Sequence, residues 1–88
     1  MKPSPETLHQ RLQQHFPDAH IVVHDDSHHH IGHAGAAGGA GHFAVTLTTP
    51  VFEGLSTVAR HRLVYDAVAD WMPHRIHALS IRAQTPTT

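Results

Sequence analysis

The spacing of apolar side chains divides this 88-residue sequence into helices and strands. Leu8, Leu12 and Phe16 recur every four residues and form one apolar stripe, which predicts an amphipathic helix over residues 4–16. Ser4 precedes the stripe as a typical N-cap residue, and Pro5, which follows it, suits the first helical position. We therefore expect a short helix near the start of the chain that packs one face against a core.

Two strands are predicted after this helix. Residues 19–24 form a short β-branched run, and residues 42–49 alternate between apolar side chains and small or hydroxyl side chains. In the second strand Phe43, Val45 and Leu47 should share one face, because successive strand residues point to opposite sides of a sheet. We expect these two strands to pair antiparallel.

A second helix is predicted over residues 57–71, with Ser56 as its N-cap and Pro73 beyond its end. The segment 51–55 before it is typical of a turn, which one turn of 3₁₀-helix would also satisfy. The expected apolar stripe of this helix is Val58, His61, Tyr65, Val68 and Met72, widened by Val64, Ala69 and Trp71.

The last predicted strand covers residues 75–83, with His77, Leu79 and Ile81 on one face, and residues 84–88 should fray. The order α-β-β-α-β predicts an α+β fold with a three-stranded sheet and both helices on one face. The direction of the third strand stays open, because the turn before the second helix can reverse the path of the chain. At this length we expect residues 1–88 to form a single domain.

The segment between the first two strands, residues 25–41, is unusual in both length and composition. It holds five of the six glycines, together with His28, His29, His30 and His33. Loops longer than about 12–15 residues without secondary structure of their own are uncommon and are usually functional or disordered. We expect this loop to be mobile and to serve the function of the protein.

Composition narrows the chemistry further. Twelve residues are His and none is Cys, so the chain offers imidazole ligands for a metal but no thiolates. This pattern favours a metal centre that is shared with a partner. No apolar run is long enough to span a bilayer, no signal-peptide pattern is present, and without cysteine no disulfides form, so we expect a cytoplasmic location and no membrane partner.

Several motifs, in the same order and with compatible spacing over nearly the whole chain, resemble those of the BolA family. They are Asp25-Asp26-Ser27-x-x-His30 before the loop, His42-Phe43-x-Val45, Phe52-x-Gly54, Arg60-His61-Arg62-x-x-Tyr65 and Ile76-His77-Ala78-Leu79-Ser80-Ile81-x-Ala83-x-Thr85. The resemblance implies a class II KH-like fold with the α-β-β-α-β order.

The resemblance also implies a partner and a shared cofactor. The partner is a monothiol glutaredoxin, and a [2Fe–2S] cluster is bridged by the glutaredoxin Cys, a glutathione thiolate and one or two side chains of the BolA-like protein. By position, these side chains would be His77 and a loop residue, with His30 the best-aligned choice and His33 the second. The isolated chain would hold no cofactor. The implied role is in iron–sulfur cluster trafficking or iron regulation.

The residues alone leave simpler interpretations open. His77 in a strand is also consistent with a hydrogen-bonded histidine at the edge of the core. The loop histidines are also consistent with a solvated polar tract that binds nickel or zinc adventitiously, and this interpretation is kept for His28 and His29 because one loop ligand is enough.

The alternative function is that of a DNA-binding transcriptional regulator of stress response or cell morphology, which has been associated with the family. Its candidate residues are Arg60, Arg62, Arg75 and Arg82. The net charge of −1 with only six Lys and Arg disfavours nucleic acid, and no Gly-x-x-Gly motif joins two helices as in nucleic-acid-binding KH domains. No nucleophile motif is present, so we expect neither an enzyme nor a small-molecule substrate.

Overall fold

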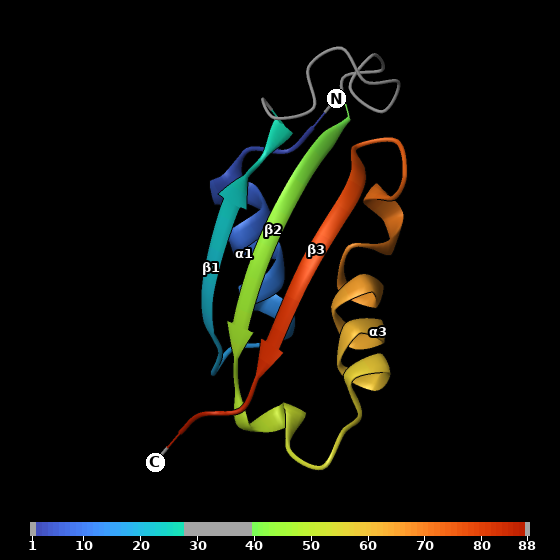
Figure 1. Ribbon diagram of the computed structural model, residues 1–88. Helices are drawn as coiled ribbons and strands as arrows, with labels where there is room; N and C mark the ends of the chain where they lie inside the picture. Colours follow the sequence, from blue (N-terminus) through green and yellow to red (C-terminus); the bar gives the residue numbers. More distant parts are fainter. Residues whose placement is uncertain (1, 28–39, 88) are drawn as a thin grey trace.

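The computed structural model describes residues 2–27 and 40–87, and the chain follows the predicted α-β-β-α-β order. The fold is α+β, with two helices and a three-stranded mixed sheet (Figure 1). Its main elements are α1 (Pro5–His15), β1 (His20–Asp25), β2 (Gly41–Thr48), α3 (Thr57–Ala67) and β3 (Ile76–Gln84). Two short 3₁₀ turns, η2 (Pro50–Phe52) and η3 (Ala69–Trp71), complete the described elements.

Both helices begin at the predicted serine caps. The hydroxyl oxygen of Ser4 accepts a hydrogen bond from the backbone N–H of Thr7 at 3.1 Å, and that of Ser56 accepts one from Ala59 at the same distance. A side-chain oxygen at this position satisfies one of the backbone donors that a helix leaves unpaired in its first turn. These two helix starts were therefore predictable from local sequence.

The sheet has the order β1-β2-β3, with β2 in the centre. The antiparallel pairing of β1 with β2 confirms the expectation for the first two strands. The third strand pairs parallel with β2, which settles the direction that the sequence left open. Parallel strands need a long crossover, and here η2, α3 and η3 supply it.

One core lies between the helices and a single face of the sheet, as predicted (Figure 1). The face is made by alternate β2 residues, Phe43, Val45 and Leu47, each at most 2 % exposed. The helices and turns cover it with Leu8, Leu12, Phe16, Phe52, Val64, Ala67, Val68 and Trp71. The opposite face of the sheet has no helix over it in the described part of the chain.

The second helix differs from its prediction in length and in its buried face. It ends at Ala67, because the N–H groups of Val68 and Trp71 bond to carbonyls three residues back and wind the chain into the 3₁₀ turn η3. Val58, expected on the apolar stripe, is 65 % exposed. Val64, Val68 and Trp71 are buried as expected and are joined by Ala67, whereas Tyr65 and Ala69 of the expected stripe are exposed.

The last strand differs from its prediction at both ends. Ile76 is buried and His77 is exposed, so His77 does not share the core face with Leu79. At the other end Gln84, expected to fray, pairs with Thr48, and its carbonyl accepts a hydrogen bond from the N–H of Thr49 at 3.0 Å. The loop was predicted to cover residues 25–41, but Asp25 is the last residue of β1 and Gly41 is the first residue of β2.

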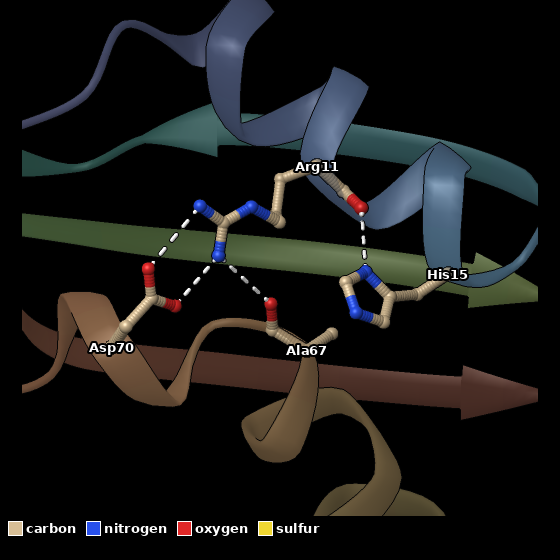
Figure 2. Close-up of polar contacts among 4 residues, drawn as sticks. All are labelled: Arg11, His15, Ala67 and Asp70. Atoms are coloured by element: carbon tan, nitrogen blue, oxygen red, sulfur yellow. Dashed lines mark hydrogen bonds and ion pairs between the residues drawn. The ribbon is translucent and has the colours of Figure 1, made fainter.

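Arg11 links α1 to the end of the α3–η3 segment (Figure 2). Its guanidinium donates to the carboxylate of Asp70 at 2.7 Å and 3.3 Å and to the carbonyl of Ala67 at 3.3 Å. It also lies 4.0 Å from the ring centroid of Trp71, a cation–π contact. None of the helices described in residues 2–27 and 40–87 is long and apolar enough to cross a membrane.

Candidate functional site

A pair of histidines marks one end of the sheet. The ring centroids of His42, on β2, and His77, on β3, lie 5.2 Å apart with the rings tilted by 51°. His42 is buried, with 6 % of its surface exposed, whereas His77 is exposed to solvent. The pair therefore presents one accessible imidazole that is supported from beneath by a buried one.

A register shift between β2 and β3 explains why His77 faces out. Gly41 pairs with Ile76, but the next residue, His42, pairs with Ala78, so His77 has no partner in the register. The extra residue lets both Ile76 and Leu79 point into the core although they are three positions apart. Irregularities of this kind re-aim side chains and are common beside functional sites.

Gly41 allows the strands to meet at this point. A Cβ atom on Gly41 would overlap the ring of Phe43 and would lie 3.0 Å from the Cβ of Lys2. The N–H of Gly41 donates to the carbonyl of Arg75 at 2.9 Å, which ties the start of β2 to the residue before β3. Only glycine fits here without displacing its neighbours.

The beginning of the long loop is anchored to His42. The N–H of Asp26 donates to the carbonyl of His42 at 2.7 Å, and the hydroxyl of Ser27 accepts from the N–H of His42 at 3.1 Å. Ser27 is itself held, because its N–H donates to the carboxylate of Asp25 at 2.9 Å. Ser27, the last described residue before residues 28–39, is therefore hydrogen-bonded directly to one member of the histidine pair.

Asp25 carries the charge of this anchor. Burial raises its pKa, but the hydrogen bonds from Ser27 and Lys2, together with the positive charge of Lys2, outweigh burial and lower the pKa to about 2. The ammonium of Lys2 lies 2.9 Å from the carboxylate. Asp25 is therefore ionised throughout the neutral pH range and remains an acceptor for both donors.

Comparison with known proteins identifies the family. A family model described as BolA-like protein matches residues 12–88. The chain belongs to the BolA-like family.

Individual relatives agree with this assignment. The chain is 37 % identical over 83 residues to the chloroplastic protein BOLA1 of Arabidopsis thaliana, covering 91 % of this chain and 52 % of that protein. It is 35 % identical over 81 residues to the DNA-binding transcriptional regulator BolA of Vibrio cholerae, covering 91 % and 73 %. The solved BolA domain of SufE1 from Arabidopsis thaliana superposes with a TM-score of 0.81 at 33 % identity, covering 98 % and 95 %. The BolA-like chain spans about half the length, or less, of the first curated relatives that it matches.

The predicted metal ligands of this BolA-like chain have different outcomes. His77 is exposed and lies against a second imidazole, whereas His30 and His33, with His28 and His29, lie outside the described residues. Among the residues described, no group of three or more His, Cys, Asp or Glu side chains could hold a metal ion. Two imidazoles supply at most half of a tetrahedral set, so a metal bound here would require further ligands from elsewhere. The assignment of the ligands stays a prediction.

Arg60, a nucleic-acid candidate of the BolA-like motif, is engaged within the fold. Its guanidinium donates to the carbonyl of Leu55 at 3.0 Å and to that of Ala83 at 3.1 Å. Tyr65 of the same motif donates its hydroxyl to the carbonyl of Leu79 at 3.0 Å. Arg60 and Tyr65 therefore join α3 to the backbone of β3, and this part of the motif has a structural role.

The other three candidate arginines are exposed. Arg62 lies on α3, Arg75 immediately before β3, and Arg82 within β3. Arg82 lines a shallow hollow of about 310 Å³ on the sheet together with Thr46 and Ser80. These three guanidinium groups are exposed to solvent, whereas Arg60 is half-buried and bonded to two backbone carbonyls.

His42, Ser27 and Lys2 are the residues of the site that sequence analysis missed. The family motif contains His42, but its position beside His77 depends on the parallel pairing of β2 with β3 and on the register shift. Neither feature has a local sequence signal. The Asp-x-Ser spacing at residues 25–27 is a signal for the turn, because a carboxylate commonly accepts from the N–H two residues ahead.

Proposed function

We propose that this BolA-like chain is a non-enzymatic cytoplasmic adaptor that binds a monothiol glutaredoxin and co-ligates a bridging [2Fe–2S] cluster. Its role would be in iron–sulfur cluster trafficking or iron regulation. The observation that carries the proposal is the exposed imidazole of His77, which lies on the buried ring of His42 beside the start of the histidine-rich loop. An accessible imidazole on a strand of the sheet is well placed to reach a metal held by another molecule.

The ligand balance of the chain supports a shared site. Iron–sulfur clusters are held mainly by thiolates, and histidine replaces cysteine on one iron in some centres. This chain has no cysteine, so the glutaredoxin and glutathione would supply both thiolates. His77 would be one ligand from this chain, and its imidazole must be unprotonated to bind iron.

The tether to Ser27 favours His30 over His33 as the second ligand. In the sequence His30 follows Ser27 by three residues, whereas His33 follows it by six. Ser27 is bonded to His42 at 3.1 Å, next to His77. A shorter tether raises the effective concentration of a ligand at the site.

Titration of a [2Fe–2S]-loaded monothiol glutaredoxin with this protein tests the proposal. We expect a saturating change in visible circular dichroism at one protein per cluster, which is lost in His77→Ala and in His30→Ala. His33→Ala is the matched loop control and should retain the change. A titration that is flat for the wild type, or that is unaffected by His77→Ala, would reject shared ligation.

DNA binding is the second candidate, and two observations support it. The relative from Vibrio cholerae carries the name DNA-binding transcriptional regulator, and Arg62, Arg75 and Arg82 are exposed in this chain. Phosphate contacts by arginine make binding strongly dependent on salt. If DNA is a ligand, Arg62→Ala should weaken binding and reduce the slope of log affinity against log salt by about 1.

The salt experiment also separates the two candidates. Binding of the cluster complex should respond mainly to pH and chelators, because it depends on deprotonated ligands rather than on released counterions. A DNA affinity that is weak and has no salt dependence would remove the second candidate without affecting the first.

A further inference from the structure

We propose that Ser27, held by Asp25, is a positioning residue for the His42–His77 imidazole pair. The proposal deepens the proposed function and rests on it where His77 is treated as a cluster ligand. It assigns a role to the Asp25-Asp26-Ser27 motif, which the ligand set itself does not use. The argument follows three contacts that connect Asp25 to His77.

The first contact fixes the backbone of His42. The regular pairing of β1 with β2 ends at Asp25 and Phe43. Beyond this pair, the backbone N–H and C=O of His42 are still bonded to residues that follow β1. The carbonyl of His42 accepts from the N–H of Asp26, and its N–H donates to the hydroxyl of Ser27. A side-chain oxygen therefore takes the place of a backbone acceptor and extends the ladder by one residue.

The second contact fixes Ser27 itself. A serine side chain has three staggered rotamers, so its hydroxyl points at one acceptor or donor only if its surroundings select one of them. Asp25 accepts from the N–H of Ser27 at 2.9 Å and is in turn paired with Lys2 at 2.9 Å. The carboxylate therefore holds the backbone of Ser27 in the turn that directs its hydroxyl to His42.

The third contact transmits this order to His77. His77 has no register partner on β2, so the ladder constrains it less than its neighbours. The centroid of its ring lies 5.2 Å from that of His42, and only 6 % of the surface of His42 is exposed. A displaced His42 backbone would carry its ring with it and would leave His77 with more rotational freedom.

A purely structural role for Ser27 makes a different prediction. Ser56 forms the same type of bond, with its hydroxyl accepting from the N–H of Ala59 at 3.1 Å at the start of α3. Loss of either hydroxyl should reduce the free energy of unfolding to a similar extent. Only loss of the Ser27 hydroxyl should also change the histidine pair, so Ser56→Ala is the matched control.

The test compares Ser27→Thr with Ser27→Val, which have similar shapes and differ in the hydroxyl. In the apo protein, nuclear Overhauser cross-peaks between the ring protons of His42 and His77 report the contact directly. We expect them to be lost in Ser27→Val, retained in Ser27→Thr and unchanged in Ser56→Ala. The affinity for [2Fe–2S]-loaded glutaredoxin should fall about tenfold in Ser27→Val only, as for other groups that orient metal ligands.

The proposal would be overturned if Ser27→Val kept the cross-peaks and the affinity of the wild type. If both Ser27 variants fail to fold, amide exchange in the wild type still decides, because a His42 N–H that is bonded to Ser27 must be protected and an unprotected one rejects the proposal. A wild type that shows no response to the loaded glutaredoxin would reject the proposed function. The ring contact in the apo protein would then still decide whether Ser27 positions the pair.

Discussion

At the scale of single residues, Asp25 is the side chain with the clearest dependence on pH. Its pKa is lowered from 3.8 to about 2 by Ser27 and Lys2, which outweigh the opposing effect of burial. A carboxyl with a lowered folded-state pKa contributes stability that is complete above its unfolded pKa and is lost as the pH falls through the folded value. The window for this group therefore lies between about pH 4 and about pH 2.

We predict that Asp25→Asn lowers the free energy of unfolding by about 1–2 kcal/mol at neutral pH, since the amide keeps an acceptor for Ser27 but loses the charge that pairs with Lys2. Urea unfolding of both proteins measures the difference. The difference should shrink as the pH falls through the window, because Asp25 of the wild type is then protonated. A difference that stays constant over this range would show that the lowered pKa does not stabilise the fold.

Residue-scale predictions from sequence succeeded where the signal was local. Ser4 and Ser56 were predicted as caps because the residues that they bond lie three positions ahead. The His42–His77 contact joins residues 35 positions apart through a parallel pairing with a shifted register, and no local pattern encodes it. His30 and His33 lie outside the described residues, so their assignment as ligands stays a prediction.

At the scale of elements, α3 is joined to β3 by side chains that bond to backbone. Arg60 donates to Leu55 and Ala83, and Tyr65 donates to Leu79. The carbonyls of Leu79 and Ala83 belong to an edge strand, where backbone groups that face away from β2 lack a strand partner. The helix therefore covers part of this edge and holds the strand that carries His77.

We predict that Arg60→Lys lowers the free energy of unfolding by about 1 kcal/mol, because a lysine cannot reproduce the two directed bonds of the guanidinium. The exposed Arg62→Lys is the control and should change stability by less than about 0.5 kcal/mol. Chemical denaturation of the two variants gives both values. If Arg60→Lys were as stable as Arg62→Lys, the structural role of Arg60 would be contradicted, and Arg60 would again be a nucleic-acid candidate.

Sequence patterns predicted the existence of each main element better than its buried face. On the second helix Val64, Val68 and Trp71 are buried as expected, but Val58, at its start, is exposed and the chain changes to 3₁₀ winding after Ala67. On β3, Leu79 and Ile81 pack on the core as expected, but His77 was assigned to the wrong face because one extra residue reverses the alternation between Ile76 and Leu79. Both errors arise from tertiary packing that overrides a regular period.

At the scale of the whole molecule, the arrangement brings three features to one end of the sheet. They are the exposed His77, the buried His42 and the anchored start of the loop. The α+β class and the helices on one face followed from element order and amphipathicity. The place where β3 meets β2 required the structure, because either strand direction satisfies the same pattern.

The central claim is that His77 binds iron of a cluster shared with a glutaredoxin. The most direct measurement is electron–nuclear double resonance of the reduced [2Fe–2S] complex formed with protein labelled with ¹⁵N in histidine only. We predict a hyperfine coupling from histidine nitrogen that is lost or changed in His77→Ala, while Arg62→Lys retains it. A reduced complex without such a coupling, or with one that is unchanged in His77→Ala, would contradict the claim.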